Sequence, residues 1–374
     1  MALCHGFCAG LAQLVEHPPC KRKVISSIPI AGTMTQETHP ESPAAGPTSA
    51  GHAPVVIAIG RNEGDRLLRC LESVTPATRV VVYVDSGSTD GSVAAAQALG
   101  AHVVSLDMKQ PFTAARARNA GFREARRIAP QAPYALFVDG DCEVAPQWLA
   151  AAASFLDARP EVAAVAGRRR ERFAQRSVYN WLCDLEWDCP PGDALACGGD
   201  VLMRVAALEQ AGGYRDDLIA GEEPELCVRL RAKGWKIWRL PLEMTLHDAN
   251  MLRFGQWWKR SMRAGFAFAE GAHLHGAPPE RHWVRESRSN WVWGLAIPFG
   301  TALAVLVAGP IALALLLVYP LQILRLAARA EGDLRQRLLQ SWFLVLGKFP
   351  QVLGQLKFVA GRLRGRQAAL IEYK

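Results

Sequence analysis

The chain has 374 residues, of which half are apolar, and its formal net charge is +8. This length allows a core domain of about 200–250 residues with additional segments. Nine scattered cysteines without a C-x-x-C pair argue against a zinc site or a disulfide framework and fit a reducing compartment. Basic residues gather near and beyond a late apolar stretch, which favours anionic lipid headgroups over nucleic acid as partners; a solvated basic face is the alternative.

The first 52 residues differ in character from the rest of the chain. Residues 1–33 show no clear period and lack the apolar core and cleavage site of a signal peptide. We interpret them as a spurious extension, similar to a translated transfer-RNA gene, and prefer Met34 as the start. Residues 34–52 are rich in Pro, Ser, Gly and Ala, which is typical of a disordered lead-in. We expect neither segment to carry function.

From residue 53 onward the pattern alternates between strand and helix. Short apolar runs predict strands at 55–60, 79–85, 103–106 and 134–138. Helical spacing and cap residues predict helices at 65–74, from Thr89 or Asp90 to Leu99, at 113–128 and at 205–210. Such an alternation predicts an α/β fold with a mostly parallel sheet, whose ligands lie at the carboxyl ends of the strands.

Acidic residues follow several of the predicted strands. Asp139 and Asp141 come directly after the strand at 134–138, and two carboxylates so close together repel each other unless a divalent cation lies between them and a phosphate. Neither G-x-G-x-x-G nor G-x-x-x-x-G-K-[ST] occurs in the chain, so a metal rather than a glycine-rich loop must hold any phosphate. A polar β-turn is the alternative for this triplet. Asp85 and the pair Asn62-Glu63 follow two other strands, so polar groups converge on one sheet edge.

Six segments occur in an order and spacing that resemble the family 2 glycosyltransferases over about residues 54–250: VVIAIGRNEGDRLLRCLESV, VVYVDSGSTDGS, ARARNAGFREA, ALFVDGDCEV, ACGGDVLMRVAALEQAGGYRDDL and GEEPELCVRLRAKGWKIWRLP. The resemblance implies a GT-A fold, Rossmann-like with helices on both faces of the sheet. It also implies inverting transfer of a sugar from a nucleotide-sugar donor with Mn²⁺ or Mg²⁺ as cofactor. Asp141 would be a direct metal ligand, and Asp139 would contact ribose or the metal through water.

The donor site is expected at the ends of the first strands, at Asn62, Glu63, Asp85, Arg118 and Asp139. The family's acidic residue at the place of Asp85 binds the nucleoside, but this carboxylate could instead cap the following turn. Arg118 lies on the helix at 113–128, where it either reaches a phosphate or base or faces solvent. His247 is a further candidate metal ligand, with a structural role as the alternative.

The catalytic base is expected in the acidic pair Glu222-Glu223. In an inverting transfer a carboxylate takes the proton of the attacking acceptor hydroxyl. The family places a Glu-Asp pair here with its second residue as base, so the resemblance implies Glu223 as base and Glu222 as its partner near the acceptor. Acidic residues at a helix N-terminus are also expected from the helix dipole alone, the role we give Glu225.

A glycine pair precedes the predicted helix at 205–210. Gly198 and Gly199 allow close backbone approach, which suits a floor under the donor sugar and the acceptor. Asp200 is grouped with them as an acceptor- or sugar-binding residue, and a helix N-cap is its alternative role.

The region after residue 250 predicts a membrane-associated part. Residues 251–290 include an amphipathic stretch at 254–273 that we interpret as an interfacial helix, with a core helix as the alternative. Gln256 is followed by Trp257-Trp258, which departs from the Q-x-x-R-W motif of processive polysaccharide synthases.

Residues 291–324 contain no charge and, as one helix, would span roughly 50 Å, well beyond a hydrocarbon core of about 30 Å. We therefore predict a transmembrane hairpin divided at Gly309-Pro310, with one tilted, kinked span as the alternative. Basic residues flank both ends, which places both flanks in the cytoplasm. Residues 325–374 are predicted to form a basic amphipathic segment whose helix, 334–361, lies on the membrane surface.

These features together predict a glycosyltransferase at the bacterial inner membrane, with its catalytic domain, residues 53–250, in the cytoplasm. Its partners would be a nucleotide-sugar donor, a lipid-linked saccharide acceptor and membrane lipids, and no nucleic acid. Its product would belong to cell-surface polysaccharide or glycolipid synthesis. A processive polysaccharide synthase and a catalytically inactive nucleotide-sugar-binding scaffold are the two alternatives.

Overall fold

The computed structural model describes residues 53–365, so our interpretations of residues 1–52 and of the tail from 366 onward lie outside the described residues. The strands of the described part are β1 (Val55–Gly60), β2 (Val81–Asp85), β3 (His102–Ser105), β4 (Tyr134–Asp139), β5 (Cys142–Val144), β6 (Val162–Glu171), β7 (Gly192–Ala194), β8 (Val201–Arg204) and β9 (Lys236–His247). They form one sheet with the order β3-β2-β1-β4-β8-β6-β9-β5, and β7 pairs with β9.

The sheet is parallel in its first half and mixed in its second half. The four predicted strands are confirmed, and β3, β2, β1 and β4 are mutually parallel, as expected. Beyond β4, the pairs β4–β8, β6–β8, β5–β9 and β7–β9 are antiparallel, and only β6–β9 is parallel. The strictly alternating strand-helix pattern, on which the parallel prediction depended, ends at β4.

Helices pack beside the strands of the sheet, and their bounds are α1 (Asp65–Val74), α2 (Ser92–Ala98), α3 (Ala114–Ile128), α4 (Trp148–Ala158), α5 (Val178–Trp187), α6 (Val205–Ala211) and α7 (Glu222–Ala232). The predicted helices are confirmed within a few residues. Val55, Val56, Ile57 and Ala58 are at most 1% exposed. Neighbouring strand residues point to opposite faces, so β1 is covered on both sides.

Helix α3 lies unusually close to the sheet because of Gly121. A Cβ atom at this position would overlap the side chain of Ile57 and lie 2.8 Å from Cγ2 of Val84. Only glycine therefore permits this approach of α3 to β1 and β2. Arg118 lies one turn earlier on α3, so this packing also fixes where its guanidinium group points.

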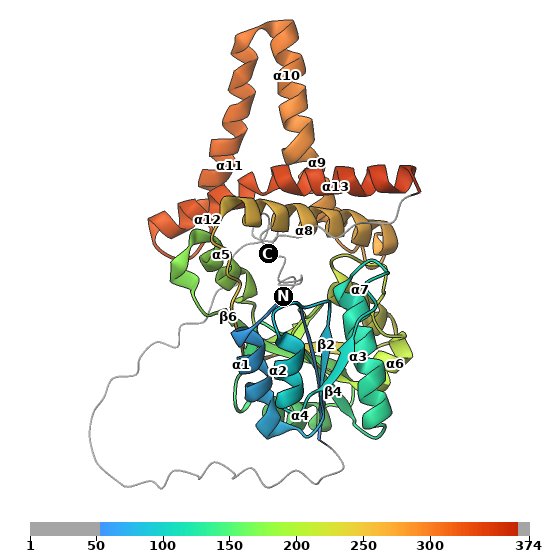
Figure 1. Ribbon diagram of the computed structural model, residues 1–374. Coiled ribbons are helices and arrows are strands. Elements are labelled where there is room, and N and C mark those ends of the chain that lie inside the picture. Colours follow the sequence, from blue (N-terminus) through green and yellow to red (C-terminus); the bar gives the residue numbers. More distant parts are fainter. Residues whose placement is uncertain (1–52, 366–374) are drawn as a thin grey trace, which may run out of the picture.

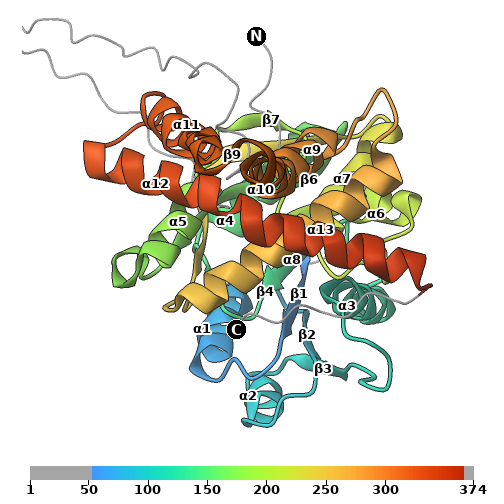
Figure 2. The ribbon, with the colours of Figure 1, turned by 90° about the horizontal axis from the view of Figure 1, so that it is seen from above.

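The remaining helices form a layer and a projecting pair (Figure 1); they are α8 (Phe254–His275), α9 (Val284–Trp291), α10 (Ile297–Ala308), α11 (Val318–Ala327), α12 (Leu334–Leu346) and α13 (Lys348–Leu363). Helices α8, α12 and α13 lie between the sheet and the α10–α11 pair, and α13 crosses over α8 (Figure 2). The crossing is close because Gly265 and Gly354 lack side chains: a Cβ atom on either would overlap the backbone of the other helix, at Gln351 and Met262 respectively.

The interpretation of 254–273 as an interfacial helix is wrong for three of its aromatic residues, whereas Trp258 is half-buried and Phe254 is exposed. Trp257, Phe266 and Phe268 are 2%, 6% and 2% exposed, and they pack within the protein rather than outward. The apolar face of α8 is covered by α13 and by the sheet domain beneath it, which a linear pattern cannot distinguish from a membrane. The predicted helix at 334–361 is also divided, since α12 ends at Leu346 and α13 begins at Lys348.

The projecting pair corresponds to the predicted hairpin. Two helical stretches, Val284–Ala308 and Pro310–Ala327, are long and apolar enough to cross a membrane by length and composition. They stand side by side and point away from the sheet, with the turn at Gly309, whose φ is +74°. Leu306 and Val307 near the tip are 82% and 89% exposed. An apolar surface of this kind is typical of a site that another apolar phase covers.

Candidate active site

A cavity of about 690 Å³ opens at the carboxyl ends of β1 and β4. Its walls come from the strand ends, from the N-terminus of α7, from β6 and β9, and from α8 and α13. The cavity brings together eleven of the predicted site residues: Asn62, Glu63, Arg118, Asp139, Asp141, Gly198, Gly199, Asp200, Glu222, Glu223 and His247.

Arg118 is the centre of a buried cluster of charges. Its Nη1 lies 2.8 Å from Oε1 of Glu222 and 2.9 Å from Oε1 of Glu223, and its Nη2 donates to Oδ1 of Asp139 at 3.0 Å. Arg118 is 3% exposed, so the alternative of a solvent-facing arginine is wrong. We refer to Arg118, Asp139, Glu222 and Glu223 as the Arg118 cluster. One guanidinium group thus joins α3, the end of β4 and the start of α7.

The predicted close approach of backbone occurs at Gly199. A Cβ atom here would lie 2.5 Å from Nη2 of Arg118 and 3.2 Å from Oε1 of Glu223, so a side chain would displace the cluster. Asp200 is not a helix N-cap, because it precedes β8. Its Oδ1 accepts from the backbone N–H of Asp139 at 3.0 Å and its Oδ2 from the hydroxyl of Thr245 at 2.7 Å. Asp200 therefore positions the end of β4.

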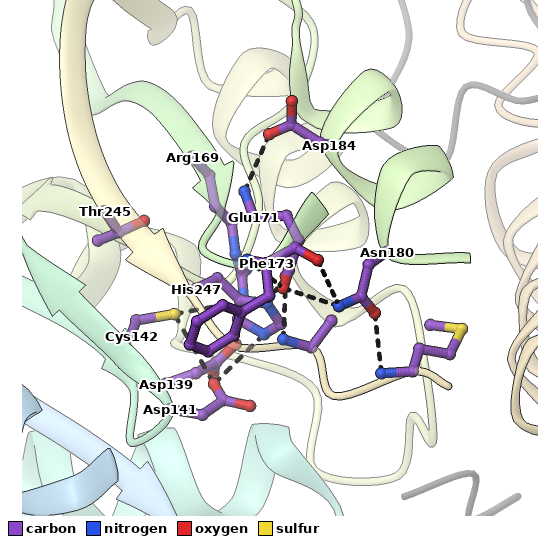
Figure 3. Close-up of polar contacts among 12 residues, drawn as sticks. Asp139, Asp141, Cys142, Arg169, Glu171, Phe173, Asn180, Asp184, Thr245 and His247 are labelled. Carbon is purple, nitrogen blue, oxygen red and sulfur yellow. Dashed lines mark hydrogen bonds and ion pairs between the residues drawn. The ribbon is translucent and has the colours of Figure 1, made fainter. Parts of the chain in front are cut away.

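His247, the last residue of β9, lies between two carboxylates (Figure 3). Its Nε2 lies 3.3 Å from Oδ1 of Asp141, and its Nδ1 lies 3.4 Å from Oε2 of Glu171. Glu171 in turn accepts hydrogen bonds from the side chain of Asn180 and from the backbone of Ala249. A carboxylate on the far nitrogen of a histidine orients the ring so that its other nitrogen faces the ligand.

These donors fit a hard divalent cation. One ligand atom each of Asp141, Cys142 and His247 lies within 4.8 Å of the others, and Asp139, Cys142 and Asp200 form a second such group. Mn²⁺ and Mg²⁺ prefer oxygen ligands and Mn²⁺ accepts imidazole, whereas the soft sulfur of a thiol suits neither ion. Asp141 and His247 are therefore the residues that would hold the metal.

Asp139 has a different environment from Asp141. Its Oδ1 faces Arg118, and its Oδ2 lies 3.3 Å from Nη2 of Arg169. Desolvation would raise the pKa of Asp139, but Arg118 and Arg169 outweigh it and hold that pKa below its ordinary value. Asp139 therefore stays ionised, and both of its oxygens already have cationic partners.

Glu223 is a carboxylate of the cavity whose pKa lies well above its ordinary value. Burial, followed by the negative charge of Glu222, raises the pKa of Glu223 to about 7, although Arg118 lowers it. Glu223 lies at the start of α7 and is 8% exposed. A carboxylate with a pKa near neutrality accepts a proton more readily than an ordinary one.

The residues that follow β1 line the cavity, whereas the residue that ends β2 does not. Asn62 and Glu63 line it, and Asn62 also holds the next loop, since its Oδ1 accepts from the N–H of Thr89 at 2.7 Å. Asp85 is not among the described lining residues. Its Oδ2 accepts from the N–H groups of Gly87 and Ser88, both at 3.0 Å, which is the turn-capping alternative.

The sequence analysis missed several residues of the site, namely Arg169, Glu171, Trp187, Arg239, Arg260 and Arg263. Arg169 lies in the run Arg168-Arg169-Arg170-Glu171 at the end of β6, and its guanidinium carbon is 4.8 Å from the ring centre of Trp187. Four consecutive charged residues at the end of a strand were a usable signal. They were overlooked because β6 lies outside the alternating strand-helix pattern.

Comparisons with known proteins concern one region of the sequence and the fold. Residues 55–186 match the family model described as "Glycosyl transferase family 2". The structure is similar to that of a mannosyltransferase from Pyrobaculum calidifontis in complex with GDP-Man and Mn²⁺, at 19% identity and a TM-score of 0.57, covering 83% of this chain and 91% of the other.

Two further structures are similar at a TM-score of 0.44. One is TarS 1-349 from S. aureus, with 14% identity over 84% of this chain and 92% of the other. The other is glucosyl-3-phosphoglycerate synthase from Mycobacterium tuberculosis in complex with phosphoglyceric acid, with 17% identity over 60% and 81%. The similarity to the mannosyltransferase shows that the fold is the GT-A fold. The family-model match makes residues 55–186 a glycosyltransferase family 2 domain.

We predict that Arg118→Leu destabilises the protein by about 3–5 kcal/mol, because it leaves two buried glutamates without their cation. The loss should be larger at pH 8 than at pH 5. Without Arg118 the pKa of Glu223 rises further above its ordinary value, so the folded state binds more protons than the unfolded state and its stability falls as pH rises. Thermal unfolding of the purified chain measures this. Arg127→Leu is the matched control on α3, since Arg127 pairs with Glu124 at the surface; an equal loss in both variants would contradict the prediction.

Proposed function

We propose that this chain transfers one sugar from a nucleotide-sugar donor, with inversion, to a hydroxyl of a lipid-linked acceptor at the bacterial inner membrane. The observation that carries the proposal is a single cavity lined by two groups of different chemistry. Asp141 and His247 are metal donors, and Glu223 is a proton acceptor. A family 2 match over residues 55–186 supports the reaction class.

The donor would bind where the strand ends supply polar groups, at Asn62 and Glu63, with its diphosphate toward Asp141 and His247. A bound Mn²⁺ or Mg²⁺ would offset the negative charge on the leaving nucleoside diphosphate. Asp139, fixed by Arg118 and Arg169, would contact the ribose. Asp85, which holds its own turn, would support this wall rather than touch the base.

Glu223 would accept the proton of the acceptor hydroxyl as its oxygen attacks the anomeric carbon. Its pKa of about 7 suits this role, because the base must be ionised before the reaction and protonated after it. Arg118 would hold both glutamates in place, and Gly199 lets the backbone approach this cluster without displacing it. Glu222 would tune Glu223 through its negative charge.

The membrane side of the proposal is supported by the apolar hairpin. Its two helices are long and apolar enough to cross a bilayer. Basic residues such as Arg288 and Arg329 lie at the base of the hairpin. The domain bounds that we propose are 53–250 for catalysis and 291–324 for the hairpin. A processive synthase remains the second candidate, but the described part offers only two apolar spans for a translocation path, and Q-x-x-R-W is altered.

We expect the purified chain to bind one of UDP, GDP or dTDP in the presence of Mn²⁺, and Asp141→Asn to weaken that binding at least tenfold, because the metal loses a carboxylate ligand. Isothermal titration with and without Mn²⁺ measures it. Glu223→Gln serves as the paired variant: nucleotide binding should survive while sugar transfer disappears. Metal-independent binding, or none of the three nucleotides bound, would refute the proposed enzyme.

The rate of transfer should rise with pH through about 7 and then level off, because Glu223 acts only when ionised. Replacing Glu222 by Gln removes the neighbouring negative charge, which lowers the pKa of Glu223. The rise in the Glu222→Gln variant should therefore move to lower pH. Initial rates across pH 5–9 at saturating donor test this, and a rise that moves to higher pH would exclude Glu223 as the base.

The hairpin predicts opposite sides for its tip and for the catalytic domain. A cysteine at Ala308, beside the turn, should react with a membrane-impermeant maleimide in intact cells. A cysteine at Lys233, exposed at the end of α7, should react only after lysis. The parent chain with its native cysteines gives the background. Labelling of neither or both in intact cells would contradict the hairpin.

A further inference from the structure

One wall of the cavity is a single face of α8. The α8 residues that line it follow helical spacing and include two arginines and no carboxylate: Arg260, Ser261, Arg263, Ala264, Ala267 and Phe268. Arg260 is fixed by Glu186, which accepts from Nη1 and Nη2 at 2.7 and 2.9 Å. Ser261, Ala264 and Ala267 have small side chains and leave space along this face. The face therefore offers both a groove and cationic groups.

This face of α8 leads directly to the proposed base. A Cβ atom at Gly221, the residue before Glu222, would lie 2.8 Å from the ring of Trp283 and 3.4 Å from Cβ of Ala267. Arg263 lies one turn before Ala267, about 6 Å along the helix axis. A molecule that lies along α8 from Arg263 toward Ala267 therefore arrives at the N-terminus of α7, where Glu223 is.

A second helix contributes a polar group at the same place. Gln351 of α13 lines the cavity and is 6% exposed, yet its Oε1 has no hydrogen-bond partner among the described residues. Gly265 allows Gln351 to lie at this place, because the backbone of Gln351 packs directly on α8 where Gly265 has no side chain. A buried amide without a partner is costly unless a ligand completes its hydrogen bonds, and it can present either its oxygen or its nitrogen to one.

We propose that this face of α8, completed by Gln351, is the acceptor subsite and that the acceptor is an amphiphile bearing a phosphate group. The inference rests on the proposed function. Arg263 binds the phosphate, since a guanidinium group matches phosphate oxygens in a bidentate manner. The part of the acceptor that bears the hydroxyl follows Ala264 and Ala267 toward Glu223. The apolar chain leaves on the other side of the phosphate through the layer of α8 and α13, which lies between the sheet and the apolar hairpin (Figures 1 and 2).

The test uses the full chain in dodecyl maltoside micelles and, as probe, dodecyl phosphate with a diazirine at the end of its chain. After irradiation, we expect labelled peptides to include residues 260–268 or Gln351. Excess dodecyl phosphate should remove this labelling, and dodecanol should not. Labelling confined to the hairpin helices, or competition by dodecanol as strong as by dodecyl phosphate, would overturn the proposal. Equal competition by inorganic phosphate would identify a site for the free anion and also overturn it.

Two variants test the role of Arg263. Arg263→Gln should lower the competed labelling about tenfold, since a charge-assisted contact with the phosphate is lost. Arg288→Gln removes the same charge from an exposed position on α9 that does not line the cavity, and it should leave labelling unchanged. If Arg263→Gln weakens Mn²⁺-dependent nucleotide binding as much as labelling, Arg263 belongs to the donor site and the proposal fails. Unchanged labelling in Arg263→Gln also overturns it.

The same preparation separates this inference from the proposed function. Nucleotide binding with Mn²⁺ together with no competed labelling on α8 or α13 would reject only the acceptor subsite. Absence of nucleotide binding together with competed labelling would reject the proposed transferase while the amphiphile site stands. In Gln351→Leu, which keeps the side-chain size, labelling should fall while nucleotide binding stays, and unchanged labelling would remove Gln351 from the subsite.

Discussion

The ion pairs of Arg118 are the interaction on which the site depends. A fully desolvated guanidinium group is costly, and its contacts with Asp139, Glu222 and Glu223 offset that cost. Since these carboxylates come from β4 and α7, the parallel half of the sheet and the helix that carries the proposed base are fixed relative to each other. Gly121 and Gly199 serve the same arrangement by omitting side chains where α3 and the loop before β8 approach it.

The cluster also separates two kinds of acid within one cavity. Asp139 has two cationic neighbours and stays ionised, whereas Glu223 shares its cation with Glu222 and has a pKa near neutrality. The difference follows from the ratio of cations to carboxylates around each group. A transferase of this type needs both kinds, a permanent anion beside the nucleotide and metal and a proton acceptor beside the attacking hydroxyl.

The sequence predicted the parts of the site that local pattern determines. Apolar runs located β1 to β4, and the strand ends of a parallel sheet converge, so the pattern alone places Asp139, Asp141 and Asn62 on one edge. It does not place Arg169 and Arg263, because their position depends on how β6 and α8 return to that edge from a distance in the chain. Asp85 shows the converse: its strand end was predicted well, but the donors next to it in the turn occupy its carboxylate.

The burial of α8 changes what its amphipathic pattern means. Its aromatic residues suggested an interfacial helix, yet three of them are buried in separate clusters. Phe266 packs against Phe358 of α13, whereas Trp257 packs against α12 and Phe268 against the segment before α9. The apolar surface that remains exposed is concentrated in the hairpin, around Leu306. Since α8 contacts the cavity with one face and α13 with another, it connects the helical layer below the apolar hairpin with the wall of the cavity beside Glu223. That position, more than its composition, explains why a helix outside the alternation of strands and helices belongs to the site.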